Sequence, residues 1–295
     1  MLTTVSNVLT QARARDLIAL TKPRLSTLVM VTAGGGIWLA PGELGWARAW
    51  LSIVATALLV AAANSLNCYL ERDTDALMRR THNRPLPSGR LDPRFALLMG
   101  WGMAPAALLA LGWAANPLTA LLGAVAFFSY VFVYTPMKRI SPLALFVGAV
   151  PGAMPPLMGY TAVTGFIDFD GLVLFGLLFT WQLPHFLAIS YYLKEDYARG
   201  GLLMFCGEYG ESVTKAAIVI TTVLLVKVSL IPAMNGMAGL TYGVIAGGLG
   251  AALLALSLAG LSPSAGAKWA RRMFLGSTLH LTLLFAALMA VGSWK

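Results

Sequence analysis

The sequence predicts an all-α integral membrane protein built as one bundle of transmembrane helices. Of its 295 residues, 58% are hydrophobic and only 11% are charged, and the mean hydropathy is +0.75. This composition is too apolar for one soluble core. A helix needs about 20 apolar residues to cross the hydrocarbon layer. The runs that qualify predict nine transmembrane helices at 25–41, 46–69, 95–114, 117–134, 143–163, 170–192, 213–233, 238–261 and 272–292.

The charged residues divide unevenly between the two sides of such a bundle. Most of the 21 Lys and Arg residues lie in the N-terminal leader or in every second connection, and the opposite connections are nearly uncharged. By the positive-inside rule, we expect the leader 1–24 in the cytoplasm and the C-terminus outside, as an odd number of spans allows. Residues 25–295 then form a single membrane-embedded domain. Topology thus explains the net charge of +9, and nucleic acid is not an expected partner.

The most informative polar segment, 67–89, follows the second apolar run. If the helix continues through it, Asn67, Glu71 and Asp75 follow at intervals of four residues and share one face. An amide oxygen and two carboxylates on one face suit a hard divalent cation such as Mg2+. The competing interpretation is a solvated helix end paired with arginines, but Asn67 lies inside the apolar run, where polar groups are costly. Asp73 is rotated by about 200 degrees from Glu71, so its place in the site stays open.

A second polar cluster closes the sixth apolar run and mirrors the first. It comprises Trp181, Gln182, Pro184, His185, Tyr191, Tyr192, Lys194, Glu195 and Asp196. Both clusters end an even-numbered span, so we expect their acids to face one cavity at the same side of the membrane. Carboxylates that hold Mg2+, with Lys and Arg beside them, suit a diphosphate, because metal and cations stabilise the charge on a departing diphosphate. Polar groups gathered at one face favour an enzyme over a channel or carrier.

These motifs resemble those of the UbiA superfamily of intramembrane prenyltransferases. The first acidic motif of that superfamily is similar to Asn67-x-x-x-Glu71-x-x-x-Asp75 followed by Arg80, Thr81, Arg84, Pro85, Leu86 and Gly89. The second motif, in the form found in the haem-prenylating members, resembles Trp181-Gln182-Leu183-Pro184-His185-Phe186 followed by Tyr191, Lys194, Glu195 and Asp196. The resemblance covers nearly the whole chain. Its first motif is specific to the superfamily, and its second motif narrows the acceptor to haem.

The resemblance implies a nine-helix bundle with a central cavity that opens near the cytoplasmic face, in the cell (inner) membrane of a bacterium. It implies Mg2+-dependent ionisation of farnesyl diphosphate and transfer of the farnesyl group to the 2-vinyl group of haem b. Addition of water completes haem O, so haem b is a substrate rather than a cofactor. Besides these substrates and the lipid bilayer, haem A synthase and terminal oxidase assembly proteins are candidate partners.

The resemblance also implies roles for individual residues. The implied catalytic residues are Asn67, Glu71, Asp75, His185, Lys194 and Asp196. The implied metal ligands are Asn67, Glu71, Asp75, Glu195 and Asp196. The implied diphosphate contacts are Arg80, Arg84, Lys138, Arg139, Lys194 and Arg199. The implied haem contacts are Trp181, His185, Tyr191 and His280.

Several alternatives stay open at this point. Glu71 stands where the aromatic-ring enzymes usually have Asp, and Lys194 replaces an acid of their second motif, which favours direct phosphate contact over a second full metal site. His185 and His280 are each explained by haem contact, by proton handling or by packing. Arg80, Arg84, Lys138 and Arg139 also fit topology signals. The competing functions are prenyl transfer to an aromatic ring and a haem carrier or transporter without chemistry.

Overall fold

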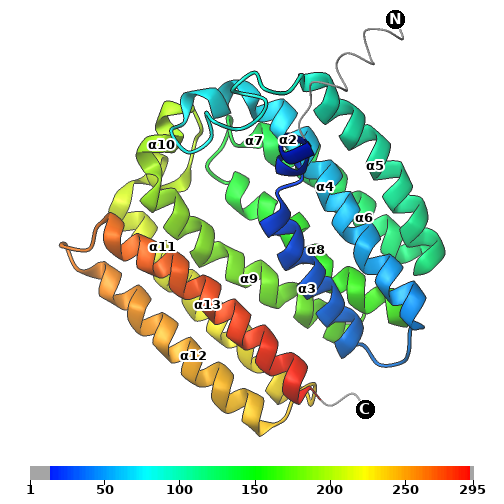
Figure 1. The fold of residues 1–295 in the computed structure, drawn as a ribbon. Coiled ribbons are helices and arrows are strands. Elements are labelled where there is room, and N and C mark those ends of the chain that lie inside the picture. The colour runs from blue at the N-terminus through cyan, green and yellow to red at the C-terminus, as the bar shows by residue number, and fades with distance from the viewer. Residues whose placement is uncertain (1–13, 293–295) are drawn as a thin grey trace, which may run out of the picture.

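The computed structural model describes residues 14–292 and shows a bundle of helices (Figure 1). The first part of the predicted leader, 1–13, and the last residues, 293–295, lie outside the described residues. The helices are α2 (Ala14–Leu20), α3 (Pro23–Leu39), α4 (Trp46–Leu77), α5 (Pro93–Ala114), α6 (Pro117–Phe128), α7 (Thr135–Met137), α8 (Ala144–Thr164), α9 (Phe169–Tyr192), α10 (Lys194–Arg199), α11 (Phe205–Met234), α12 (Leu240–Leu258) and α13 (Ala267–Val291). A π-helical turn, Ser129–Tyr134, joins α6 to α7, and a 3-10 turn, Ala259–Leu261, extends α12.

Within residues 14–292, seven helices are long and apolar enough to cross a membrane. They are Trp46–Leu77, Pro93–Ala114, Pro117–Met137, Phe169–Tyr192, Phe205–Met234, Leu240–Leu261 and Ala267–Val291. The other two predicted spans, 25–41 and 143–163, coincide with α3, which has 17 residues, and with α8, whose three internal prolines lower its hydropathy. The all-helical membrane architecture is therefore confirmed, and the count of nine spans stays a prediction.

Helix α4 continues well past the predicted end of its span at residue 69 and reaches Leu77. Hydropathy alone ends the span at its first charged residues. The helix continues because its last two turns are buried against other segments, with Glu71 and Asp75 among the buried residues. This continuation is what places Asn67, Glu71 and Asp75 on one helical face.

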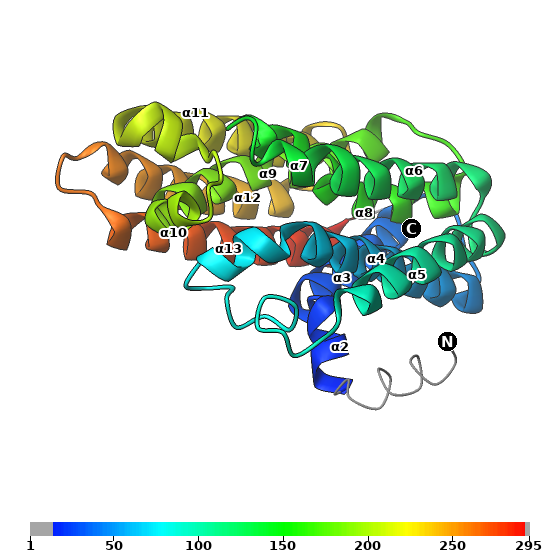
Figure 2. The same ribbon diagram turned by 90° about the horizontal axis from the view of Figure 1, so that it is seen from above.

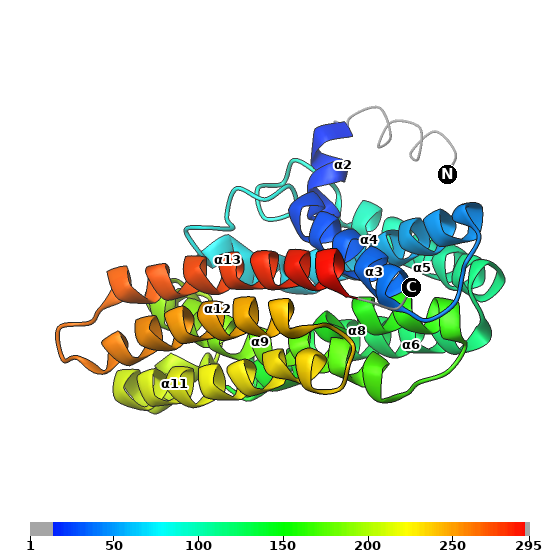
Figure 3. The ribbon, with the colours of Figure 1, turned by 90° about the horizontal axis from the view of Figure 1, so that it is seen from below.

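Helix α9 lies in the middle of the bundle and packs against α8, α11 and α13. Figure 1 shows α11, α12 and α13 on one side of α9 and α3 to α6 on the other. The view from below shows α11, α12 and α13 side by side (Figure 3). The start of α2 and the end of α13 lie at opposite ends of the bundle (Figure 1).

Helices α3 and α8 approach each other so closely that only glycine fits at two positions. A Cβ atom on Gly36 would lie 2.1 Å from the backbone oxygen of Pro156, and one on Gly159 would lie 2.0 Å from the backbone oxygen of Ala33. Small residues that let helix backbones meet are typical of membrane bundles. This contact fixes α3 against α8, and with α3 it fixes the turn at Thr21 and Lys22 that precedes the helix.

Candidate active site

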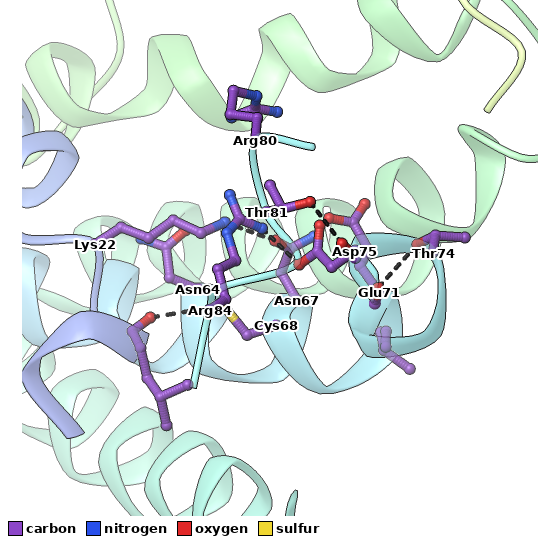
Figure 4. A network of polar contacts seen from close by, with 12 residues as sticks. Lys22, Asn64, Asn67, Cys68, Glu71, Thr74, Asp75, Arg80, Thr81 and Arg84 are labelled. Atoms are coloured by element: carbon purple, nitrogen blue, oxygen red, sulfur yellow. Dashed lines mark hydrogen bonds and ion pairs between the residues drawn. The ribbon is translucent and has the colours of Figure 1, made fainter. Parts of the chain in front are cut away.

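The predicted polar face of α4 is buried at the end of the bundle that also carries α2, α7 and α10 (Figures 1 and 2). Asn67, Glu71 and Asp75 are 0%, 7% and 1% exposed. The close-up shows their side chains together with those of Lys22 and Arg84 (Figure 4). Burial of two carboxylates is costly unless each has a partner, so this face is not a solvated helix end.

Each of the three side chains on this face accepts a hydrogen bond from a cation on a different segment. Lys22 Nζ donates to Asn67 Oδ1 at 2.7 Å, Lys138 Nζ donates to Glu71 Oε1 at 2.7 Å, and Arg84 Nη1 donates to Asp75 Oδ2 at 2.6 Å. Lys22 is the N-cap residue of α3, Arg84 lies in the loop after α4, and Lys138 follows α7. Three cations and two carboxylates leave one net positive charge, which favours an anionic ligand.

Neutral contacts hold the same face in position. Asn67 Nδ2 donates to Thr135 Oγ1 at 3.1 Å, which ties α4 to α7. Thr81 Oγ1 donates to the backbone oxygen of Asp75 at 2.9 Å, which folds the following loop back over the helix end. Lys138 also lies 4.4 Å from the centre of the Tyr134 ring. The Asn67 side chain, the backbone at Asp75 and the Lys138 ammonium are therefore held by contacts besides the three charged pairs.

The pKa values of the three cations at the edge of this face are shifted in different directions. Burial lowers the pKa of Lys22, because loss of water disfavours its charged form. Burial acts in the same direction on Lys138, but Tyr134 and Glu71 outweigh it and hold the pKa of Lys138 well above its ordinary value. For Arg84, burial is again outweighed, chiefly by Asp75, and the pKa is raised. Lys138 and Arg84 therefore keep their charge throughout the physiological pH range.

The α4 face fits a divalent metal ion by its donor chemistry. Among the described residues, Asp75 Oδ1 is a buried oxygen without a hydrogen-bond partner, and it lies on the face that also carries the oxygens of Asn67 and Glu71. Within residues 14–292 no group of three His, Cys, Asp or Glu side chains gathers at one point. A metal held here would therefore need the amide oxygen of Asn67 or oxygens of the substrate besides the two carboxylates.

The second motif lies at the same end of the bundle, but its acids have other partners. Asp196 accepts hydrogen bonds from the backbone N–H groups of Arg79 at 2.8 Å and Arg80 at 3.3 Å, and from Arg199 Nη2 at 2.6 Å. Burial alone raises the pKa of the Asp196 carboxyl, but Arg199 and the two N–H groups outweigh it and the pKa is lowered. Glu195, its neighbour, is exposed. Asp196 thus joins α10 to the loop that follows α4.

We expect Asp196→Asn to loosen residues 79 and 80 without unfolding the bundle. Charge-assisted hydrogen bonds contribute about 1.5–3 kcal/mol each, so trypsin should cleave after Arg79 or Arg80 roughly tenfold faster than in the unaltered protein. Glu195→Gln is the matched control, because it removes the same charge from an exposed neighbour. Equal cleavage of the two variants would show that Asp196 does not hold the loop.

Aromatic and polar side chains of α9 face α13. Trp181 Nε1 donates to the backbone oxygen of Ser277 at 2.6 Å, and His185 Nδ1 lies 2.9 Å from Ser277 Oγ. The His185 ring lies 4.6 Å from that of Trp181 and 4.8 Å from that of Phe274. His280 is 3% exposed, and within the described part of the chain neither of its ring nitrogens has a hydrogen-bond partner.

Two cavities open beside these motifs. One has a volume of about 300 Å³ and is lined by Asp75, Arg80 and Arg84 together with residues of α2. The other, of about 940 Å³, is lined by Arg80, Lys194, Asp196 and neighbours from α9, α11 and α13. Arg80 borders both. The first motif thus faces one cavity and the second motif the other.

The comparison with known proteins decides the family. The UbiA prenyltransferase family matches residues 28–291. The chain belongs to the UbiA prenyltransferase family. Among its curated UbiA relatives, the protoheme IX farnesyltransferase of Anaeromyxobacter dehalogenans is 58% identical over 277 residues, which cover 94% of each chain. The protoheme IX farnesyltransferase of Myxococcus xanthus is 50% identical over 93% of this chain and 94% of its own.

Solved structures share the UbiA fold at low identity. Digeranylgeranylglyceryl phosphate synthase superimposes with a TM-score of 0.80 at 14% identity, over 94% of this chain and 97% of its own. A UbiA homologue from Archaeoglobus fulgidus, bound to GPP and Mg2+, has a TM-score of 0.64 at 17% identity, over 92% of this chain and 99% of its own. The UbiA-type fold expected from the motifs is therefore confirmed.

Sequence reasoning missed two members of these clusters. Lys22 is not among the predicted site residues, although it reaches Asn67 across 45 residues of chain. Glu211 accepts from Tyr191 OH at 2.6 Å and also pairs with Lys194. The sequence does carry a signal for Glu211, because Gly210 just before it is a potential helix breaker, and in the structure Gly210 interrupts α11 with a φ of 80°. Among the predicted diphosphate contacts, Arg139 donates to the backbone oxygen of Leu70 at 3.2 Å, and its contact with diphosphate stays a prediction.

Proposed function

We propose that this UbiA enzyme transfers the farnesyl group of farnesyl diphosphate to the 2-vinyl group of haem b, with addition of water, to give haem O. The single observation that carries the prenyl transfer is the buried α4 face, where Asn67, Glu71 and Asp75 meet Lys22, Lys138 and Arg84. The curated relatives named protoheme IX farnesyltransferase support haem b as acceptor and farnesyl as donor.

In this proposal the α4 face binds the diphosphate end of the donor. Asn67, Glu71 and Asp75 are the residues that would hold Mg2+, as the orphaned Asp75 Oδ1 supports. Mg2+ held by these residues would supply Lewis-acid stabilisation of the charge on the departing diphosphate. Lys22, Lys138 and Arg84 would donate hydrogen bonds to the phosphate oxygens in place of their present acceptors. The buried position keeps water from the allylic carbon until the acceptor is in place.

In this proposal the second motif binds the haem acceptor. Trp181 and His185 form an aromatic surface together with Phe274, which suits the face of a porphyrin. Roles for Tyr191 and His280 in haem contact, and for Lys194, Glu195, Asp196, Arg139 and Arg199 in diphosphate or metal contact, stay predictions. We also keep haem A synthase and terminal oxidase assembly proteins as predicted partners.

We propose that α3 and α8 complete a nine-span bundle in the bacterial inner membrane, with one domain over 25–295 and a cytoplasmic leader over 1–24. The opposite placement of the start of α2 and the end of α13 supports an odd number of spans. The basic residues beside both motifs support a cytoplasmic position for the site and for the opening of its central cavity.

The test is product formation by the purified protein in lipid. With haem b, farnesyl diphosphate and Mg2+, we expect a more hydrophobic haem with the mass of haem O, and we expect EDTA to abolish it. A parallel reaction supplies an aromatic-ring acceptor in place of haem b. Prenylation of the ring without haem O would replace haem as the acceptor, and no prenylation in either reaction would contradict the enzymatic function.

A further inference from the structure

The larger of the two cavities, which we call the α10 pocket, has chemistry that the diphosphate does not require. It lies between α10, the residues that follow α4 and the start of α13. Its volume of about 940 Å³ lies toward the upper end of the range of roughly 300–1,000 Å³ that is usual for sites of small organic ligands. The pocket is therefore large enough for a ligand of the size of a porphyrin.

The charges around the α10 pocket leave two arginines without an acidic partner. Four cations and three acids line it: Arg79, Arg80, Lys194, Arg199, Glu195, Asp196 and Glu211. Lys194 is paired with Glu211, and Arg199 with Asp196. Among the described residues, Arg79 and Arg80 have no ion-pair partner, although Arg80 lies 6.0 Å from the Tyr197 ring centre. The guanidinium groups of these two consecutive residues, which both line the pocket, thus remain available for an anionic ligand with two carboxylates.

The inner wall of the α10 pocket is aromatic. Tyr191, Tyr197 and Phe274 line it. The Phe274 ring is the one that lies 4.8 Å from His185, which in turn lies 4.6 Å from Trp181. The pocket therefore leads from two arginines at its edge to the aromatic surface of the second motif. A flat aromatic ligand with acidic groups along one edge would match this arrangement of arginines at the edge and aromatic rings further inside.

We propose that the α10 pocket receives the carboxylate edge of the porphyrin acceptor, with Arg79 and Arg80 as the ion partners of its two propionates. This inference rests on the proposed function, in which haem b is the acceptor. In haem b the propionates and the vinyl groups occupy opposite edges of the ring. Propionates held by Arg79 and Arg80 therefore direct the vinyl edge inward, where the farnesyl donor is bound.

This assignment gives Arg80 a partner other than the diphosphate that its motif suggests. Arg80 is set apart from the α4 cluster in the close-up (Figure 4), and the side chain that pairs with Asp75 is that of Arg84. The backbone N–H groups of Arg79 and Arg80 are bonded to Asp196. Substitution of either side chain leaves those bonds in place, so the position of the loop is preserved.

The experiment measures binding of haem b and of its dimethyl ester, in which both propionates are blocked, by absorbance titration of the purified protein without farnesyl diphosphate. Exposed ion pairs contribute up to about 1 kcal/mol each. We therefore expect the double variant Arg79→Gln and Arg80→Gln to weaken haem b binding roughly fivefold to tenfold. Binding of the ester should not change. Arg94→Gln is the matched control, because Arg94 is exposed, has no ion pair within the described residues and lies outside both pockets.

The outcomes separate this inference from the proposed function. Equal binding of haem b and its ester, or equal effects of the double variant and Arg94→Gln, would overturn the propionate site even if haem O is formed. If the double variant has a raised KM for farnesyl diphosphate and unchanged haem b binding, Arg79 and Arg80 bind the diphosphate and not the propionates. Binding that depends on the propionates, without formation of any haem O, would support the propionate site and contradict the proposed reaction.

Discussion

Asp75→Asn is expected to lower kcat/KM for farnesyl diphosphate at least about a hundredfold, since loss of one preorganised electrostatic contact to a transition state costs that much. Asp75 supplies both the partner of Arg84 and the orphaned oxygen that faces the proposed metal. The change preserves shape and removes charge, so the bundle should still fold. The measurement is the rate of haem O formation at saturating haem b, with farnesyl diphosphate and Mg2+ varied separately.

Asp73→Asn is the matched control, because Asp73 lies on the same helix with a side chain that is 78% exposed. We expect this variant to keep nearly full activity, which would also settle the open place of Asp73 in the site. If Asp75→Asn and Asp73→Asn lose activity to the same extent, the α4 face does not bind the reacting diphosphate.

Gly159→Ala is expected to destabilise the protein, because the added Cβ would lie 2.0 Å from the backbone oxygen of Ala33. A backbone atom cannot rotate away as a side chain can, so α3 and α8 must separate. Overpacking of this kind costs about 1–3 kcal/mol. The expected result is a lower temperature of thermal unfolding in detergent, together with weaker binding of farnesyl diphosphate, since α3 positions Lys22.

Gly247→Ala in α12 provides the comparison, because a Cβ there meets nothing within 4 Å. Alanine is favoured over glycine in a helix by about 1 kcal/mol, so this variant should be as stable as the original or slightly more so. Equal unfolding temperatures for the two variants would mean that the contact between α3 and α8 does not limit stability.

The spacing of four residues was enough to predict the α4 face, because helical periodicity is a local property and needs no tertiary information. Hydropathy likewise located the seven helices that are long and apolar enough to cross a membrane. It ended α4 too early, because it registers the charge of Glu71 and Asp75 and not the contacts that bury them. The partners of Asn67 and Glu71 follow no local rule. Lys22 and Lys138 lie 45 and 67 residues away from theirs, and only the packing of α3 and α7 brings them to α4.

The second motif also has a contact that local sequence patterns could not predict. Its sequence predicts acids that face a shared cavity. Asp196 does line the α10 pocket, but it also accepts hydrogen bonds from two backbone N–H groups, which the sequence did not predict. A carboxylate that binds main-chain donors leaves no trace in the sequence of the segment it binds, because every residue except proline offers the same N–H group. The role of Asp196 in joining α10 to the loop was therefore not predictable from residue types.

Arg80 lines the cavities of both motifs, and Asp196 anchors the backbone at this point. A ligand that displaces Arg80 from one cavity changes the walls of the other. By thermodynamic reciprocity, the donor and the acceptor must then alter each other's affinity by the same factor. Binding of either substrate would then change the affinity for the other to the same extent, whichever of the two binds first.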